Sequence, residues 1–338
     1  MKRRTFLAAT TTGILGLKTF GAHAGESEKK QAKRSLRFIH LTDMHIHAGS
    51  VPERGIKNLL EEIHSLDEKP DFVINTGDNI MDSLKRSKEE TAAQWDSWQQ
   101  YYRSELRYEL FSCVGNHDVW GWSLKNSEIE CDPLFGKNWA ISKLAIPNRY
   151  YSIDKKDWHF IFLDSSFRDI VNKSYTAKID DEQFEWLVDD LKQTDQTKSI
   201  CIVSHIPIIS ASVFFDGDNQ KSGDWNIPGA WMHIDARKLK DLFAGYPNIK
   251  LAISGHVHLA DHTNYLGINY LCNGAACGAW WNGNYQEFPP MYAIIDLYND
   301  GTFNSQLVYY DWRKRNNSSF ETTAKTALKL QKQQNLNL

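Results

Sequence analysis

Residues 36–45 read Leu-Arg-Phe-Ile-His-Leu-Thr-Asp-Met-His, an apolar, strand-like run that ends in Asp43 and His45. Four further apolar runs end in the same way, just before residue types that bind metal ions. They are 72–75 before Asp78, 110–114 before Asn116, 200–204 before His205, and 249–254 before His256 and His258. Because open α/β sheets keep their sites where strands end and loops begin, we expect these side chains to gather in one place.

The groups at the ends of these runs are carboxylates, imidazoles and an amide, which are ligands that Zn, Mn and Fe accept. Asp43 and His45 are two residues apart, so both side chains leave a strand in the same direction and can reach one ion. Gly77, Gly115 and Gly255 precede ligands and permit the backbone to turn tightly around the ions. The sequence therefore predicts a two-metal hydrolytic centre.

The blocks D-x-H, G-D, G-N-H-D, a single H and G-H-x-H follow one another from Asp43 to His258. In these blocks and their order, the chain resembles the calcineurin-like metallophosphoesterase superfamily over roughly two thirds of its length. The resemblance implies an α/β fold (α+β in some schemes), a four-layer α/β/β/α sandwich with two mixed β-sheets flanked by helices. It also implies two divalent or mixed-valence transition-metal ions, Mn, Zn or Fe.

The resemblance also implies a role for each residue of these blocks. One ion is held by Asp43, His45 and His258, the other by Asn116, His205 and His256, and Asp78 bridges both. A hydroxide that bridges the ions attacks phosphorus in line. His117 acts as general acid or donates a hydrogen bond to the transition state, and Asp118 orients a neighbouring imidazole or an outer group.

The chain departs from two branches of the superfamily. The protein phosphatases have an extra Asp three residues after the aspartate of G-D, a place taken here by Met81, with Asp82 one residue further on. The resemblance therefore assigns no carboxylate partner to His117. The purple acid phosphatases use a Tyr ligand for ferric iron, whereas position 45 here is His, so their site is not implied.

The favoured hypothesis is an exported, dinuclear phosphoesterase that hydrolyses small phosphate esters. No Arg or Lys clamp for a second phosphate is evident beyond Arg168, which favours phosphodiesters, including cyclic nucleotides. A phosphomonoesterase and a non-catalytic metal- or ligand-binding protein stay open as alternatives, and the retained His117 argues for turnover. Lys and Arg number 39 against 42 Asp and Glu, a formal net charge of −3, so nucleic acid is not an expected partner and a nuclease is disfavoured.

Residues 1–24 have the features of a bacterial export signal. Lys2-Arg3-Arg4 precedes a weakly apolar stretch, and Ala22-His23-Ala24 is a small-x-small cleavage signature. Arg3 to Leu7 resembles a twin-arginine signal, with a Sec signal as the alternative. The apolar run is shorter than the ~20 residues of a membrane span, so no stable membrane anchor is expected. The predicted location is periplasmic or secreted, reached through the export machinery.

The remaining organisation is predicted from periodicity and turn residues. Residues 25–34 are a linker, 35–312 the metallophosphoesterase domain, and 313–338 a tail or peripheral helix. Helices are predicted over 54–66, 88–106, 180–191 and 235–243, a hairpin over 150–164, and strands over 265–273, 291–297 and 302–310. The oligomeric state stays open.

Other histidines, cysteines and aromatic residues lie outside these blocks. His40, His64 and His159 are predicted to be structural, whereas His47, His233 and His262 fit either the rim of the site or solvent. Cys113 and Cys201 lie in predicted core strands, and Cys272 and Cys277 are close enough in sequence to bridge a loop. The aromatic pairs at 120 and 122, 214 and 215, and 280 and 281 pack in the core or in loops by one interpretation. By the other, Trp120 and Trp122 after the 115–118 block and the segment 210–233 after His205 wall the site and stack on an organic leaving group.

Overall fold

The computed structural model describes residues 32–124 and 127–314. The predicted export signal, most of the predicted linker and residues 315–338 of the tail lie outside the described residues. Within the described ranges, every helix is too short or too polar to cross a membrane.

The first sheet has five strands in the order β15-β14-β1-β2-β3. These are β1 (Arg34–Leu41), β2 (Phe72–Asn75), β3 (Leu110–Ser112), β14 (Met291–Tyr298) and β15 (Phe303–Tyr309). β1, β2 and β3 run parallel, while β14 pairs antiparallel with β1 and with β15. β1 begins at Arg34, inside the predicted linker, and the parallel strands end on the side where the ligand residues follow.

The second sheet has six strands in the order β12-β13-β11-β8-β5-β4. These are β4 (Tyr151–Lys155), β5 (Trp158–Phe162), β8 (Ser199–Val203), β11 (Ile249–Ser254), β12 (Asp261–Tyr265) and β13 (Ile268–Cys272). The four inner strands are parallel and the two edge strands antiparallel. Two small ribbons complete the strands: β6 (Ser166–Asp169) with β7 (Ser174–Ala177), and β9 (Gln220–Lys221) with β10 (Asp224–Trp225).

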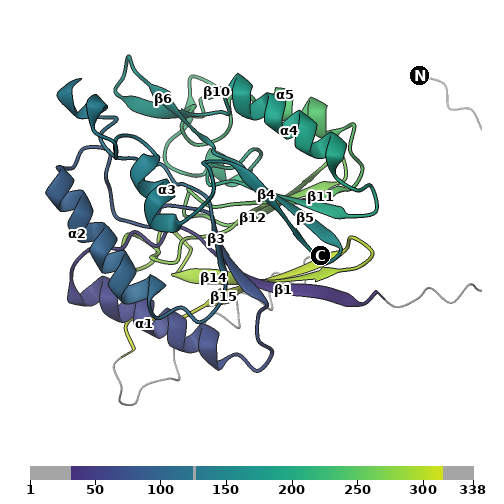
Figure 1. Ribbon diagram of the computed structural model, residues 1–338, viewed down its shortest axis with the longest axis horizontal. Coiled ribbons are helices and arrows are strands. Elements are labelled where there is room, and N and C mark those ends of the chain that lie inside the picture. Colours follow the sequence, from purple (N-terminus) through teal and green to yellow (C-terminus); the bar gives the residue numbers. More distant parts are fainter. Residues whose placement is uncertain (1–31, 125–126, 315–338) are drawn as a thin grey trace, which may run out of the picture. The chain divides into compact units, whose positions relative to one another are not determined.

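Helices cover the outer faces of both sheets, and the inner faces pack on each other. The helices are α1 (Ser50–Ser65), α2 (Lys88–Trp98), α3 (Asn138–Leu144), α4 (Asp181–Gln193) and α5 (Ala236–Phe243). Phe38 and Phe72 of the first sheet contact Phe160 of the second inside one apolar cluster. α1 and α2 lie on one side of the sheets and α4 and α5 on the other (Figure 1). The predicted mixed α/β fold with helices flanking mixed sheets is confirmed.

Helix α1 shows how one helix face joins the sheet to the site. Its buried residues recur at helical spacing, as in Ile56, Leu59 and Ile63, so one stripe packs against the first sheet. Gly55 on the same stripe leaves room for a tryptophan, because a Cβ there would lie 2.1 Å from Cζ3 of Trp281. Glycine has a low helix propensity, so Gly55 costs the helix some stability but provides the space that the Trp281 ring occupies.

Two predicted elements differ from the structure. The helix predicted over 88–106 is α2, opened by the Ser87 and Glu90 capping box, followed by a π-helical turn, η1 (Gln99–Arg103). The strand predicted over 265–273 corresponds to β13, and the strand before it, β12, which pairs with it as a hairpin, was not predicted. The turn of this hairpin occupies Leu266 and Gly267, both with left-handed φ (51° and 82°), which is the geometry of a two-residue hairpin loop.

His159 on β5 lies between two carboxylates, in keeping with a structural role. Its Nδ1 is 2.8 Å from Asp154 Oδ1, and its Nε2 is 2.8 Å from Asp190 Oδ2 on α4. Burial lowers the pKa of His159, but hydrogen bonds to the two carboxylates outweigh it and raise the pKa above 6.5. The pair of contacts thus stabilises the fold fully below pH 6.5, and this stabilisation is lost as pH rises through the raised value.

We expect His159→Asn to flatten the dependence of stability on pH. Wild-type protein should lose roughly 1 kcal/mol more than the variant between about pH 6 and about pH 9. Calorimetric unfolding of chelator-treated protein across this range measures the difference. His262→Asn on the exposed strand β12 is the matched control and should follow the wild type. If the free energies of unfolding of the wild type and of His159→Asn changed with pH in parallel, the pH-dependent stabilisation assigned to His159 would be contradicted.

Candidate metal centre

The seven predicted ligand residues lie together at the carboxyl ends of strands from both sheets. Asp43 and His45 follow β1, Asp78 follows β2, Asn116 follows β3, His205 follows β8, and His256 and His258 follow β11. Six of them are buried, and His256 is half-buried. The fold therefore brings together all the side chains that the sequence pattern singled out.

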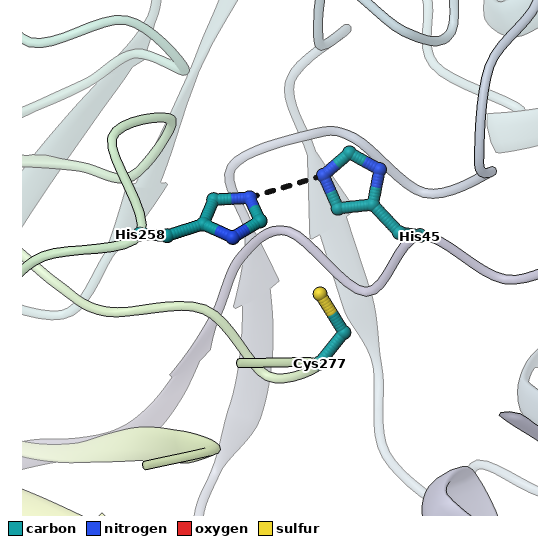
Figure 2. Close-up of side chains that lie close together, drawn as sticks. All are labelled: His45, His258 and Cys277. Atoms are coloured by element: carbon teal, nitrogen blue, oxygen red, sulfur yellow. Dashed lines mark hydrogen bonds between the residues drawn. The ribbon is translucent and has the colours of Figure 1, made fainter. Parts of the chain in front are cut away.

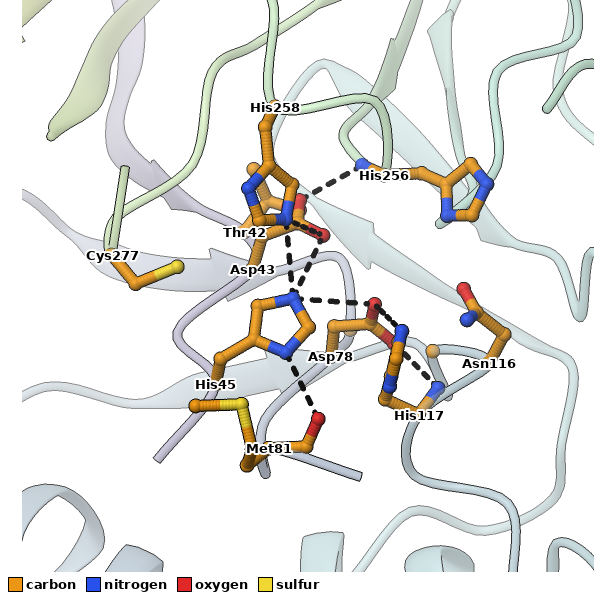
Figure 3. A network of polar contacts seen from close by, with 12 residues as sticks. Thr42, Asp43, His45, Asp78, Met81, Asn116, His117, His256, His258 and Cys277 are labelled. Atoms are coloured by element: carbon orange, nitrogen blue, oxygen red, sulfur yellow. Dashed lines mark hydrogen bonds and ion pairs between the residues drawn. The ribbon is translucent and has the colours of Figure 1, made fainter. Parts of the chain in front are cut away.

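The first group of ligands converges on Nε2 of His45. This atom is 3.1 Å from His258 Nε2, 3.6 Å from Asp78 Oδ2 and 3.9 Å from Asp43 Oδ1. His258 Nε2 is itself 3.5 Å from the same oxygen of Asp43. Figure 3 shows these side chains pointing toward one another, so one ion can contact all of them.

The second group converges on Nε2 of His205. This atom is 2.8 Å from Asn116 Oδ1, 3.2 Å from His256 Nδ1 and 3.3 Å from Asp78 Oδ2. Oδ2 of Asp78 therefore faces both groups. A single carboxylate oxygen shared by two ligand sets is the arrangement expected of a bridging residue.

Backbone carbonyls fix which nitrogen three of the four ligand imidazoles offer. Nδ1 of His258 is 2.7 Å from the Gly278 carbonyl, and Nδ1 of His45 is 3.3 Å from the Met81 carbonyl. In His256 the roles are reversed, because Nε2 is 2.9 Å from the Ala230 carbonyl. A nitrogen that donates to a carbonyl leaves the other nitrogen with a free lone pair, and in each case that nitrogen faces the ligand group.

The donor set fits metal cations. Imidazole nitrogens with lone pairs face each other, and Oδ1 of the buried Asp43 has no hydrogen-bond partner in the described structure. Burial lowers the pKa of His45 and of His256 to about 3, so both imidazoles are neutral. Burial lowers the pKa of His205, but Asp78 outweighs it and raises the pKa, so this imidazole can offset part of the buried negative charge, a role that bound cations would take over.

Cys277 lies beside the first ligand group (Figure 2). Its Sγ is within 4.8 Å of ligand nitrogens of His45 and His258. All five cysteines are unpaired in the structure, so the loop bridge between Cys272 and Cys277 that sequence spacing permits is not formed. Burial raises the pKa of the Cys277 thiol, which keeps it neutral next to the imidazoles.

The ligand turns have unusual backbone geometry. φ is positive at Asp43 (53°), His45 (43°), Asp78 (51°), His256 (78°) and His258 (58°), a region that non-glycine residues rarely occupy. The turns also approach closely, because a Cβ on the glycine at 115 would lie 2.0 Å from the backbone nitrogen of Asp78. The predicted need for glycine at this position thus has a steric cause.

His117 lies at the opening of the site, next to both an acid and the bridging carboxylate. Its backbone N–H donates to Asp78 Oδ1 at 2.8 Å, and its ring Nε2 is 4.0 Å from Asp78 Oδ2. Its Nδ1 is 3.4 Å from Oδ1 of Asp82. Burial lowers the pKa of His117, but Asp78 and Asp82 outweigh it and raise the pKa to about 9. Asp82 is thus the carboxylate partner of His117, for which the family resemblance assigns no residue.

Asp82 reaches His117 because its backbone is fixed by α2. The Asp82 N–H donates to Gln94 Oε1 at 2.9 Å, and Gln94 Nε2 donates to the Asp82 carbonyl at 2.7 Å. The next residue, Ser83, donates its N–H and its hydroxyl to the His117 carbonyl. The two loops are therefore joined on both sides of the ion pair.

Asp118 contacts the backbone rather than an imidazole. Its Oδ1 accepts from the N–H groups of Asn79 and Ile80, at 2.8 and 3.2 Å, and its Oδ2 accepts from the Asn79 side chain and the Gly115 N–H, both at 2.9 Å. Burial, together with the charge of Asp78, raises the pKa of Asp118 to about 6. These hydrogen bonds hold the two ligand turns together, so of the two roles considered for Asp118 the contacts agree with orienting an outer group rather than an imidazole.

His47, His233 and His262, which the sequence places either at the rim of the site or in solvent, have hydrogen-bond partners other than the ligand residues. His233 is buried, with Nδ1 2.9 Å from Asp235 Oδ1. His262 bonds to Asn269 within the β12–β13 hairpin. The His47 ring contacts the Ala48 carbonyl. Hydrogen-bonded positions in loops and strands account for all three.

A cavity of about 240 Å³ opens over the ligands, and its lining was only partly foreseen. Of the six aromatic residues considered from the sequence, Trp280 lines it. Trp120, Trp122 and Trp281 are buried in the core instead, and Phe214 and Phe215 are exposed outside the lining. Asp216 and Trp231 also line it, and both lie in the segment 210–233 that the sequence offers as a wall. Tyr175 on β7 and Tyr285 were missed, because neither follows a metal-binding block.

Comparisons with known proteins agree with this geometry. The sequence profile described as Calcineurin-like phosphoesterase matches residues 36–260. A 3′,5′-cyclic-nucleotide phosphodiesterase of Nostoc sp. is 23% identical over 81% of this chain and 92% of its own length. A 3′,5′-cyclic adenosine monophosphate phosphodiesterase of Escherichia coli is 19% identical over 80% and 89%. A dimetal phosphatase from Danio rerio has the same fold, with a TM-score of 0.54 at 11% identity over 82% of this chain and all of that one. Since the profile spans more than half of the sequence, the chain belongs to the calcineurin-like phosphoesterase family and is a metal-dependent hydrolase of phosphoric esters.

Proposed function

We propose that this protein is a phosphodiesterase that uses two transition-metal ions to hydrolyse small phosphate diesters. The observation that carries the proposal is the pair of ligand groups that share Oδ2 of Asp78. Asp43, His45 and His258 would hold one ion, and Asn116, His205 and His256 the other. When bound, two such ions lower the pKa of a shared water and neutralise phosphoryl oxygens.

The protein's own residues supply orientation and a proton. Asp82 and Asp78 keep His117 protonated, and the His117 ring lines the cavity. A protonated imidazole there can donate its Nε2 proton to the leaving oxygen as the bond to phosphorus breaks. The Gly278, Met81 and Ala230 carbonyls hold three of the four ligand imidazoles in one tautomer, so these three need little rearrangement during turnover.

The charge of the cavity supports a diester over a monoester. A monoester dianion gains from Lys or Arg beside the ions, whereas no Lys or Arg among the described residues lines this cavity, and Asp216 adds a carboxylate. Arg168, the candidate considered from the sequence, instead pairs with Glu130. Two of the relatives are named as cyclic-nucleotide phosphodiesterases, which adds support for the same class.

A substrate panel tests the proposal. Chelated protein is reloaded with Mn, Zn or Fe and assayed with bis(p-nitrophenyl) phosphate, p-nitrophenyl phosphate and 3′,5′-cyclic AMP. We expect metal-dependent turnover with kcat/KM at least about tenfold higher for bis(p-nitrophenyl) phosphate than for the monoester. A higher value for the monoester would assign a phosphomonoesterase. No turnover with any metal would assign a non-catalytic binding protein.

We also propose that the protein is exported to the periplasm or secreted. Arg3 and Arg4, the apolar stretch and Ala22-His23-Ala24 support this. Fractionation of bacteria that express the full chain, compared with an Arg3→Lys, Arg4→Lys variant, tests it. The wild type is expected outside the cytoplasm and the variant inside. Export of both to the same extent would favour the Sec pathway.

A further inference from the structure

The cavity wall beside the first ligand group consists of aromatic rings and one acid. Trp280 lies 4.5 Å from His258 between ring centroids, and Tyr285 lies 5.5 Å from the same imidazole. Trp231 and Tyr175 line the same cavity. Asp216 completes the wall, with Oδ1 accepting a hydrogen bond from the Tyr285 hydroxyl at 2.5 Å. The machinery for hydrolysis described above uses none of these five residues.

The rings are arranged as a corner. The planes of Trp280 and Tyr285 meet at 89°, with centroids 5.5 Å apart. The imidazole of His258 also lies against Trp280, tilted by 35°, so this part of the indole is not free to stack on a flat ring. Two perpendicular ring faces enclose a compact, rounded group better than a flat heterocycle, which gains most from parallel stacking.

The charge on this wall is negative. The Tyr285 hydroxyl donates its hydrogen bond to the Asp216 carboxylate and brings no positive charge to it. Asp216 is half-buried, and among the described residues its carboxylate accepts one further hydrogen bond, from the neutral amide of Gln286 at 3.4 Å. The described lining holds no Lys or Arg, and His117, which also lines the cavity, pairs with Asp82 and Asp78 rather than with Asp216. Aromatic faces beside an uncompensated carboxylate attract organic cations.

We propose that this wall binds the ammonium group of one arm of the substrate, so that the preferred diester carries a quaternary or primary ammonium a few bonds from phosphorus. The inference rests on the proposed phosphodiesterase function and names its substrate class. The ions take the phosphoryl oxygens, the Trp280 and Tyr285 corner encloses the ammonium, and Asp216 neutralises its charge. The arm that carries the ammonium stays on phosphorus while the other arm leaves.

Matched substrates isolate the charge of the arm. p-Nitrophenyl phosphorylcholine and its carbon isostere, p-nitrophenyl 3,3-dimethylbutyl phosphate, have the same leaving group and nearly the same shape. We expect kcat/KM to be at least about tenfold higher for the choline ester. The p-nitrophenyl ester of thymidine 5′-phosphate tests a flat base in the same position. Equal values for the choline ester and its isostere, or a clear preference for the thymidine ester, would overturn the proposal.

Variants of the wall residues, each with a matched control, test whether these residues cause the preference for the choline ester. Asp216→Ala and Trp280→Leu should each bring the ratio of choline ester to isostere toward one, while turnover of the isostere persists. Asp218→Ala, on the same loop, and Trp225→Leu, an exposed tryptophan that packs on Phe214, should leave the ratio unchanged. A ratio that survives both Asp216→Ala and Trp280→Leu would contradict the assignment.

Binding measured without turnover separates this proposal from the one it rests on. Tetramethylammonium is expected to bind wild-type protein in calorimetric titrations and to bind Asp216→Ala at least about tenfold more weakly. If none of the p-nitrophenyl esters is hydrolysed with any metal, the phosphodiesterase proposal fails, whatever the ammonium result. If the esters are hydrolysed but tetramethylammonium does not bind, the ammonium site alone fails.

Discussion

Asp78→Ala is expected to release both metal ions and to reduce turnover at least about 10³-fold. Oδ2 of Asp78 faces Nε2 of His45 and Nε2 of His205, so its loss removes a ligand from each ion and the link between them. Two ions that share a ligand supply several kcal/mol of transition-state stabilisation, which sets the size of the effect. Metal content by plasma emission spectrometry and kcat/KM on bis(p-nitrophenyl) phosphate measure the two losses.

The control for this prediction is Asp67→Ala, which removes an exposed carboxylate that follows α1. It should keep both ions and full activity. Because Asp78 also accepts the His117 N–H, circular dichroism and melting of metal-free protein establish that the Asp78→Ala variant is folded. A folded Asp78→Ala variant that retains two ions per chain and turnover near wild type would refute the bridging role.

His117→Ala is expected to keep both ions and to lose about 10²- to 10⁴-fold in kcat, the usual contribution of a positioned general acid. The ring lines the cavity but belongs to neither ligand group, so metal content should stay at the wild-type value. Asp82→Asn should give a smaller loss, about tenfold, because it weakens only the carboxylate that orients His117. His262→Ala, on the exposed β12 hairpin, is the matched control.

The leaving group distinguishes the two roles considered for His117. A general acid matters most when the leaving alkoxide is a strong base, so the loss should be larger for an alkyl ester than for a p-nitrophenyl ester. A donor that only stabilises phosphoryl charge in the transition state would reduce both rates by the same factor. Full activity of His117→Ala on both esters would exclude either role.

The positions of the ligand residues could be predicted because local rules determine them. Apolar runs of strand length ending at Asp43, Asp78 or His205 place these residues at strand ends whatever the details of packing. The sequence predicts that Gly115 lets the ligand turns approach closely, and in the structure the backbone of Asp78 lies where a side chain at 115 would begin. The hairpin of β12 and β13 was missed, because Leu266 and Gly267 interrupt an otherwise continuous strand pattern by only two residues.

The partners of these residues depend on packing between distant segments, which sequence spacing does not encode. Asp82 reaches His117 through hydrogen bonds from Gln94 on α2, so counting residues from the G-D block could not place it. The sequence left two roles open for Asp118, since an aspartate next to a histidine can turn toward backbone amides as readily as toward a ring. The cavity wall joins Asp216 and Tyr285, 69 residues apart, across two irregular loops.

The left-handed turns at five of the ligand residues bear on any attempt to rebuild this site elsewhere. Each such turn costs about 1 kcal/mol or more when it carries a side chain, and the surrounding fold has to enforce it. An engineer who grafted the same carboxylates and imidazoles onto ordinary strand ends would therefore obtain side chains that diverge. Transplanting this chemistry requires copying the loops as rigid backbone pieces, glycines included, and not the residue types alone.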